Sequence, residues 1–540
     1  MSDSIQVITY DVGTTGMKSC LFAIGSEIKL IDSEMGTYDL HILENGGAEQ
    51  DPLEWWTAIC TTTRRLLART GTAPGSIVGI SFCSQMQGLV LVDQEGRPLR
   101  RMMSYMDQRA VEELREGMAH GLQIAGVNIF KLLRSIHETG AVAASVKDPV
   151  WKYRWVRKNE PELFSRIHRW LDVKEFLIHR CTGRFIMTRD SAFATLLYSI
   201  RQGRQGWSEA ICRMTGVEMK HLPEIVGSTD LVGGLTARAA GELGLRPGTA
   251  VFGGGGDASL IGIGAGAVAP GDTHIYMGTS GWVSTVVERS IVDPTAMIAA
   301  IVGAQPGSFN YFAELETAGK CFEWVKDHLA LDEIGIYLQK QAVHESKEAA
   351  YKSLYDYMTA VIKTAAPGSS GVIFTPWLHG NRCPFEDPAS RGIFFNIGLD
   401  TGKTELIRAV LEGVCFHLRW MLEAQERKVR CSPAIRFVGG GALSETTCQI
   451  LADVLGRNVE TVENPQNVGA VGAAAVIAVG LKLIPALVEA KKMIPISRSF
   501  SPNSENRPIY DRNFDIFKRL YYSNRNNFAR LNSGRGSLSR

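Results

Sequence analysis

A short segment near the N-terminus, DVGTTGMKS, gathers residue types that suit the binding of a phosphate chain. Gly13 lets the backbone approach a ligand closely. Thr14, Thr15 and Lys18 offer hydroxyl and ammonium donors to phosphate oxygens. Asp11, at the start of the segment, could hold a magnesium ion directly or through water. Taken alone, the segment fits a solvated hairpin turn equally well, because short glycine-rich matches often arise by chance.

A second turn of the same kind, GTSGW, opens with Gly278 and Thr279 in the second half of the chain. It matches DVGTTGMKS in its setting, because each turn separates two β-prone runs. Two opposed turns rich in glycine and hydroxyl groups predict a phosphate chain bound in a cleft between two domains.

A carboxylate follows the four glycines of FGGGGD, and this residue is Asp257. In such a place a carboxylate could orient a hydroxyl group and accept its proton, while the glycines let a sugar and a phosphate come close. An aspartate after a glycine run is also an ordinary helix N-cap. Both interpretations stay open on the residues alone.

Apolar runs and turn residues predict the elements that position these groups. Residues 5–10 begin a β-hairpin whose turn is DVGTTGMKS. A helix is expected from Pro52, with Asp51 as its cap. Residues 77–93 predict two strands broken by polar residues in the middle. Most of the pattern in residues 107–245 is helical, including the segment NEPELFSRIHRWLDVKEFLIHR.

The second half repeats the organisation of the first, with TAVFGGGGDASLIGIGAGAV followed by THIYMGTSGWVSTVV. A chain of 540 residues also exceeds what one hydrophobic core usually serves. We therefore expect an N-terminal domain over residues 1–248, a C-terminal domain over residues 249–500, and a C-terminal helix and tail over residues 501–540.

The composition is that of an ordinary globular protein, with 45% hydrophobic and 21% charged residues. A formal net charge of +2 does not indicate nucleic acid or an anionic membrane as a partner. The ten cysteines include no Cys-x-x-Cys pair, and the N-terminus lacks the pattern of a signal peptide. We expect reduced thiols and a cytoplasmic location.

The segments DVGTTGMKS, GGGGD and GTSGW, in this order, resemble the FGGY family of carbohydrate kinases. The resemblance covers most of residues 5–525 and is greatest to xylulokinase-type members, through EQDPLEWW, SQMQGLVLVD, YMDQR, LHGNRCPFEDPASRGIFF, RAVLEGV and VGGGALSETTCQILADVLG. It implies an α/β, two-domain actin-like ATPase (ribonuclease H-like) fold with an interdomain cleft. It also implies ATP-dependent phosphorylation of a hydroxyl group of a small ketose or polyol, with a pentulose such as xylulose as the leading acceptor.

The same resemblance assigns roles to single residues. Asp257 corresponds to the family's catalytic base, and Mg²⁺ would be held by Asp11 and Asp257. Met86 and Gln87 of SQMQG correspond to a Met-His pair that binds the substrate in xylulokinases, so a histidine is replaced here by glutamine. Asp107 matches the aspartate of a Trp-Asn-Asp segment in which the first two residues differ here. These departures put D-xylulose itself in question, and Met86 fits core packing as well as pocket lining.

On the nucleotide side, the resemblance implies contacts from glycine-rich turns in the second half of the chain. The residues concerned are Gly278, Thr279, Gly319, Gly440, Gly441 and Ala442. Any one of these turns could simply end a strand, but their joint order favours nucleotide binding. The sequence has no G-x-x-x-x-G-K-[ST] loop, so a P-loop mechanism is not indicated.

Two further functions compete with a sugar kinase. One is a catalytically weak, sugar-responsive regulatory protein on the kinase fold, against which the presence of Asp11 and Asp257 counts. The other is a chaperone-like ATPase module, for which the sequence shows no peptide-binding appendage. A homodimer is expected only because it is common in the family.

Overall fold

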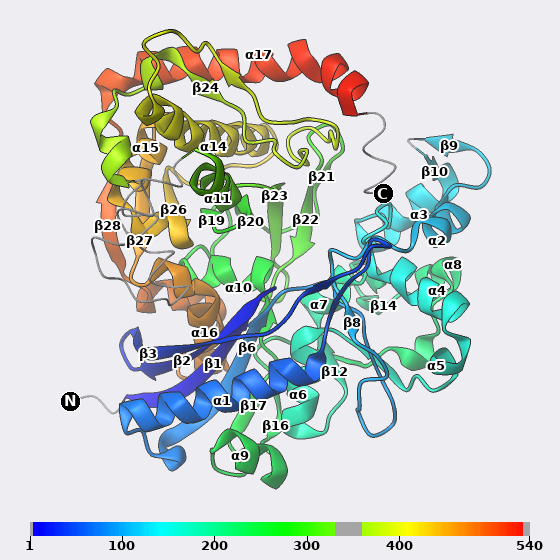
Figure 1. Ribbon diagram of the computed structural model, residues 1–540. Coiled ribbons are helices and arrows are strands. Elements are labelled where there is room, and N and C mark those ends of the chain that lie inside the picture. Colours follow the sequence, from blue (N-terminus) through cyan, green and yellow to red (C-terminus); the bar gives the residue numbers. More distant parts are fainter. Residues whose placement is uncertain (1–3, 125, 330–358, 533–540) are drawn as a thin grey trace.

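The computed structural model describes residues 4–124, 126–329 and 359–532. In this part of the chain, two large mixed sheets form the centres of two domains, and helices surround them (Figure 1). The last residues of the predicted C-terminal tail, 533–540, lie outside the described residues.

The first sheet is built on the predicted N-terminal hairpin. Its strands, in spatial order, are β16 (Leu231–Gly234), β17 (Ala250–Phe252), β6 (Ile77–Ser84), β1 (Ile5–Val12), β2 (Gly16–Ile24) and β3 (Ile28–Thr37), with β18 (Gly255–Gly256) beside β6. Strands β1, β2 and β3 are antiparallel, whereas β6 runs parallel to β1. The division predicted after residue 248 stays a prediction, and the two strands that follow it pair with this first sheet.

The second sheet repeats this pattern. Its strands, in spatial order, are β21 (Val292–Asp293), β22 (Ile298–Val302), β23 (Phe309–Leu315), β20 (Gly281–Val287), β19 (Thr273–Met277), β26 (Ala434–Val438), β27 (Asn458–Val462) and β28 (Ile496–Phe500). Here β19 and β20 form the antiparallel hairpin, and β26 runs parallel to β19. The prediction that the second half repeats the organisation of the first is confirmed.

Helices cover both faces of the first sheet. Because strand side chains alternate between faces, Ile8 and Tyr10 point to the same side and pack with Trp55 of α1 (Pro52–Thr70). Val7 points to the other side, into a core shared with α16 (Val468–Gly480). Helix α1 begins as predicted, since the Asp51 carboxylate accepts a hydrogen bond from the Leu53 N–H.

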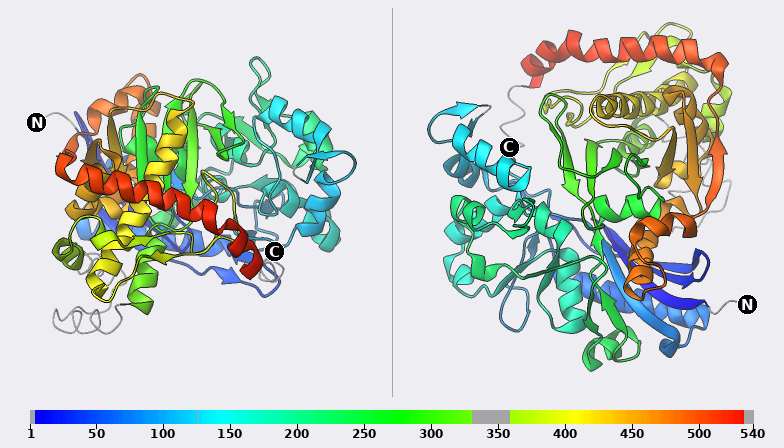
Figure 2. Two further views of the ribbon diagram at one scale, coloured as in Figure 1. Left: turned by 90° about the horizontal axis from the view of Figure 1, so that it is seen from above. Right: turned by 180° about the vertical axis from the view of Figure 1, so that it is seen from behind.

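Helix α10 (Asp257–Gly264) crosses α16 at very close range between the two sheets (Figures 1 and 2). A Cβ atom at Gly264 would lie 1.8 Å from the Val468 carbonyl oxygen. On the facing helix, a Cβ atom at Gly472 would lie 2.2 Å from the Leu260 carbonyl oxygen. The glycines of both helices are therefore needed for this contact, which fixes α10 against a helix from the far end of the chain.

A helical lobe stands beside the first sheet, as residues 107–245 predict (Figure 1). The helices of this part of the chain are α2 (Val111–Met118), α3 (Ile129–Thr139), α4 (Pro149–Asn159), α5 (Pro161–Ser165), α6 (Val173–Thr182), α7 (Arg189–Ala194), α8 (Glu209–Thr215) and α9 (Ala237–Leu243). Of these, α6 and α9 pack with α1 on the first sheet itself. The helical interpretation of NEPELFSRIHRWLDVKEFLIHR was wrong in the middle. There β11 (Arg169–Leu171) pairs with β7 (Val90–Val92) and buries Trp170, a contact with a distant segment.

Four further helices belong to the second domain: α11 (Gly319–His328), α14 (Lys403–Glu426), α15 (Glu445–Leu455) and α17 (Arg507–Asn532). Helix α17 runs across the outer side of this domain (Figure 2) and buries Tyr510, Phe514, Phe517 and Tyr521 on one face. Among the described residues, none of the helices has the length and apolar character needed to cross a bilayer.

Candidate active site

Asp11 lies near the end of β1, beside Lys18 of β2 and Cys83 of β6 in the sheet register. Burial raises the pKa of the Asp11 carboxyl, and the positive charge of Lys18 works against this shift. The Lys18 ammonium donates hydrogen bonds to the Gln466 carbonyl (3.0 Å) and to Oδ1 of Asn467 (3.0 Å). Two of its three donors are thereby used to tie the hairpin to the segment before α16, so a phosphate contact of Lys18 stays a prediction.

Hydrogen bonds within the protein stabilise the turn between β1 and β2. The Gly13 N–H donates to the Gly16 carbonyl at 2.9 Å. The Tyr38 hydroxyl donates to the carbonyl groups of both glycines. No local sequence pattern indicates this tyrosine, because it follows β3 and lies 25 positions from Gly13 in the sequence.

The two threonines of this turn differ in their surroundings. Oγ1 of Thr14 lies 3.2 Å from the hydroxyl of Tyr105, and the Thr14 carbonyl accepts a hydrogen bond from Gln50. Thr15 is exposed. The turn thus presents one hydroxyl toward Tyr105 of the YMDQR segment and another to solvent.

Asp257 is the first residue of α10, and its Oδ1 accepts a hydrogen bond from the Ala258 N–H at 2.7 Å. Its side chain is half-buried. Burial raises the pKa of Asp257 to about 7, and the negative charges of Asp11, Glu314 and Asp190 add to this effect. A carboxyl group with a pKa near neutrality is suited to accept a proton at physiological pH. The N-cap of α10 is Gly256, so the N-cap interpretation of Asp257 was wrong, and the catalytic interpretation stays a prediction.

Met86 and Gln87 lie on the loop between β6 and β7, and Met86 contacts the glycine run before α10. A Cβ atom at Gly256 would lie 2.0 Å from Sδ of Met86, so only glycine allows this contact. Gln87 has a φ of 65°, and its carbonyl accepts a hydrogen bond from the fully buried ammonium of Lys152 (2.7 Å). The structure thus places Met86 against the residue that precedes Asp257, and substrate contacts of Met86 and Gln87 stay a prediction.

The predicted nucleotide-side residues also gather at one place, the end of β19. The Gly319 N–H donates to the Gly278 carbonyl at 2.9 Å, and the Thr279 carbonyl accepts from the start of α11. A Cβ atom at Gly441 would lie 2.6 Å from Sδ of Met277, the last residue of β19. At Gly440 a Cβ atom would meet nothing within 4 Å, so its backbone is open to a ligand. Ala442 is buried directly behind these glycines.

Family comparison agrees with this geometry. The model of the FGGY carbohydrate kinase N-terminal domain matches residues 6–264, and that of the C-terminal domain matches residues 274–481. The chain belongs to the FGGY family of carbohydrate kinases.

Several known proteins are similar along nearly the whole chain. The xylulose kinase of Bacillus subtilis is 28% identical over 95% of this chain and 96% of its own length. The gluconokinase of the same organism is 26% identical over 84% of this chain and 83% of its own length. A ligand-bound xylulose kinase from Lactobacillus acidophilus has a similar fold, with a TM-score of 0.82 at 23% identity, over 97% of this chain and 99% of that one. The predicted two-domain actin-like α/β fold is confirmed.

Asp107, to which the FGGY resemblance assigns a role in substrate binding, is surrounded by other protein groups. The Asp107 side chain is fully buried. Its Oδ2 accepts hydrogen bonds from the Ala48 N–H (3.0 Å) and from Nη2 of Arg109 (2.6 Å). Its Oδ1 accepts from the backbone N–H and Nε of Arg109. This geometry favours a role in shaping the loop that carries Tyr105, and direct contact between Asp107 and a substrate stays a prediction.

Other residues near the FGGY site carried no sequence signal. Asp190 and Glu314 add negative charge around Asp257, and Lys152 supports the loop of Gln87. Each acts through a partner that is far away in sequence, and such contacts leave no local pattern. For Lys152, the resemblance of its segment DPVWKYRWVRKNEPE to the FGGY family led us to expect a role in positioning the lobe, but not the contact with Gln87.

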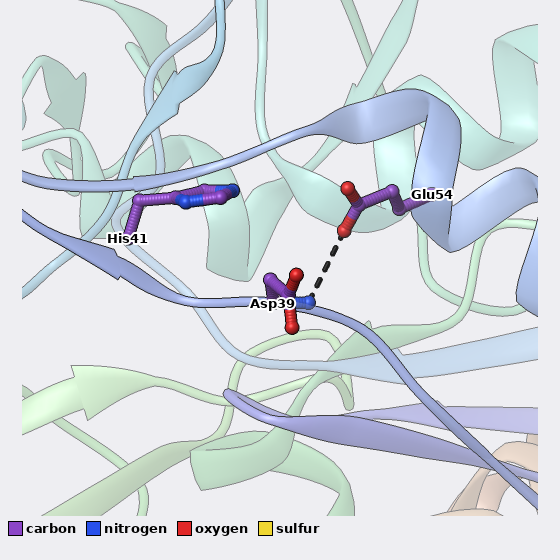
Figure 3. A group of neighbouring side chains, drawn as sticks. All are labelled: Asp39, His41 and Glu54. Atoms are coloured by element: carbon purple, nitrogen blue, oxygen red, sulfur yellow. Dashed lines mark hydrogen bonds between the residues drawn. The ribbon is translucent and has the colours of Figure 1, made fainter.

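Three residues of types that can bind metal ions lie close together near the start of α1, apart from the candidate active site. Among the described residues, Asp39, His41 and Glu54 place one ligand atom each within 4.8 Å of one another (Figure 3). The Glu54 carboxylate accepts a hydrogen bond from the Asp39 backbone N–H at 3.1 Å. The group includes neither Asp11 nor Asp257, and we assign it no function.

Proposed function

We propose that this FGGY kinase transfers the γ-phosphoryl group of ATP to a hydroxyl group of a small ketose or polyol. The observation that carries this proposal is the placement of Asp257. Its half-buried carboxylate, with a pKa of about 7, starts α10 beside the Met86–Gln87 loop. The two glycine-hydroxyl hairpins belong to the two sheets that flank this helix.

In the proposed reaction, Asp257 orients the acceptor hydroxyl and takes its proton as the hydroxyl oxygen bonds to the γ-phosphorus. The bond between the γ-phosphorus and the bridging oxygen breaks, so ADP leaves and the phosphorylated sugar remains. Asp257 then returns its proton to solvent. Most of the acceleration comes from holding the two reactants in line and excluding water.

Asp11 and Asp257 would hold Mg²⁺. Two carboxylates supply the oxygen ligands that this ion prefers, and the charge of Asp11 already disfavours ionisation of Asp257. A bound divalent cation would relieve that repulsion and neutralise phosphate charge during transfer. ATP would be held by the hairpin turns, with Gly13, Thr14, Thr15 and Lys18 on one side. The other side is formed by Gly278, Thr279, Gly319, Gly440, Gly441 and Ala442.

A pentulose such as xylulose is the leading acceptor that we propose, because xylulose kinases are similar over 95% of the chain. Gln87 provides an amide that donates and accepts hydrogen bonds but does not titrate, unlike the histidine of xylulokinases. Other ketoses, pentitols and tetritols are therefore the next candidates. The comparisons give the regulatory alternative no support.

The test measures ADP release from magnesium ATP over a panel of ketoses, polyols and sugar acids, with wild-type protein and the Asp257→Asn variant. We expect one acceptor class to raise wild-type turnover well above background. Asp257→Asn should lower kcat by about 10²- to 10⁴-fold, the contribution typical of a general base. An exposed carboxylate outside the site serves as the matched control, and Asp39→Asn should behave like the wild type.

A flat panel with wild-type protein that binds ATP would contradict the proposed acceptor class. Full turnover in Asp257→Asn would contradict the role of the base. ADP release that needs no acceptor would instead indicate an ATPase.

We also propose a cytoplasmic location. All ten cysteines lie within the described residues and are free thiols, nine of them buried, which suits a reducing compartment. The homodimer expected from the family stays a prediction.

A further inference from the structure

The buried carboxylate of Asp190 forms a hydrogen bond with the glycine run immediately before Asp257. Asp190, in the first turn of α7, is 1% exposed. Its Oδ2 accepts a hydrogen bond from the Gly256 N–H at 2.8 Å. Gly256 is the residue before α10, so this bond fixes the backbone from which the Asp257 side chain projects. A Cβ atom at Gly255 would lie 3.0 Å from the same carboxylate oxygen, which shows how closely the two segments approach.

Asp190 is itself held by a polar network inside the helical lobe. Its Oδ1 accepts a hydrogen bond from Oγ1 of Thr188 at 2.5 Å. The ammonium of Lys174 donates to Thr188 (2.6 Å) and to Oγ of Ser191 (2.7 Å), and it also pairs with the carboxylate of Glu175. Lys174 and Glu175 have fully buried side chains. A carboxylate fixed in this way has little freedom to move, so the position that it imposes on Gly256 is well defined.

The second domain also touches this helix start. Nδ2 of Asn310, on β23, donates to the Ala258 carbonyl at 3.3 Å. The charged groups around Asp257 are Asp11 from β1, Glu314 from β23 and Asp190 from α7, and the thiol of Cys83 from β6 lies near them. Gly256 pairs with Ser84 of β6 in the first sheet, and the Asp190 carboxylate of α7 accepts the hydrogen bond from its N–H.

We infer that Asp190 is a positioning residue for Asp257: it holds the Gly256 N–H, and so sets where the catalytic carboxylate meets the acceptor hydroxyl. This inference rests on the proposed function. It predicts an effect on turnover with little effect on nucleotide binding, because the proposed ATP-binding turns lie on other elements. Small displacements of a catalytic group can cost about 10²-fold in rate.

The test compares Asp190→Ala and Asp190→Asn with the wild type in the same kinase assay. Asp190→Ala removes the bond to Gly256 and should lower kcat about 10- to 100-fold, with the KM for ATP unchanged. Asparagine keeps an oxygen that accepts the Gly256 N–H, so Asp190→Asn should recover most of that loss.

A matched control separates positioning from general loss of stability. Asp453 on α15 is equally enclosed, at 4% exposed, and accepts hydrogen bonds from Gln449, Asn503 and Asn506. Asp453→Asn should leave kcat and the KM for ATP as in the wild type.

The possible outcomes distinguish this inference from the proposed function. A wild-type protein without acceptor-dependent turnover would overturn the proposed function, and the positioning role with it. An active wild type, an inactive Asp257→Asn variant and a fully active Asp190→Ala variant would overturn the positioning role alone. If Asp190→Ala does not fold, a Thr188→Val variant, which removes the hydrogen bond that holds Oδ1 of Asp190, should lower kcat in the same way, and wild-type kcat in that variant would overturn the positioning role.

Discussion

At the scale of single residues, the account depends on the ionisation of Asp257. The base must be unprotonated to accept a proton, and its pKa is raised to about 7, chiefly by burial. Below that pH a growing fraction of the protein carries the protonated, inactive carboxyl group. We therefore predict that kcat/KM falls about tenfold per pH unit on the acid side of neutrality. Initial rates from pH 5 to 8 test this, and a flat profile across that range would contradict it.

The residues that could be predicted from the sequence are those that lie in local motifs. Asp11, the turn of Gly13 to Lys18, and Asp257 all fall within short segments whose composition suits phosphate or proton transfer. Asp190 could not be found in this way, because its link to Gly256 joins positions 66 residues apart. The enclosure of Asp107 was equally invisible, since one of its partners, the Ala48 N–H, lies 59 positions away in the sequence.

At the scale of elements, the crossing of α10 and α16 positions Asp257, the proposed base. At Gly264 an added methyl group would collide with the Val468 carbonyl oxygen, 1.8 Å away. We predict that Gly264→Ala destabilises the protein by about 1–3 kcal/mol, as overpacking does. It should also lower turnover, because α10 carries Asp257 at its start. Thermal or denaturant unfolding and kcat are the measurements.

The control for this prediction is a helical glycine with free space around it. At Gly241, in α9, a Cβ atom would meet nothing within 4 Å. Gly241→Ala should therefore be neutral or mildly stabilising, because alanine restricts the unfolded chain. Equal stability of both variants would contradict the claim that the helix crossing requires glycine.

Elements defined by their own sequence were predictable, and elements defined by a remote partner were not. Helix α1 was expected from its Asp-Pro start, and the hairpins were expected from their glycine turns. Strand β11 was hidden within a helical pattern, because it exists only through pairing with β7, which lies some 80 positions away in the sequence. The close approach of α10 and α16 joins two segments still further apart.

At the scale of the whole molecule, a helix from the second half of the chain packs on the sheet formed by the first half. Helix α16 follows β27 of the second sheet, yet it packs on β1 and β6 of the first. Oγ1 of Thr9 donates a hydrogen bond to the Ala470 carbonyl at 3.1 Å, which joins β1 to this helix directly. Asp11 and α10 therefore lie at the junction of the two domains, where a phosphate donor on one side can meet an acceptor on the other.

The most direct test of the central claim is to follow the phosphorus itself. ³¹P NMR of magnesium ATP with the best acceptor of the panel, before and after addition of enzyme, shows where the γ-phosphoryl group goes. The account predicts a new sugar-phosphate signal that grows as ADP appears, and no such signal with Asp257→Asn. Inorganic phosphate as the only new species, or an equal sugar-phosphate signal from the variant, would contradict it.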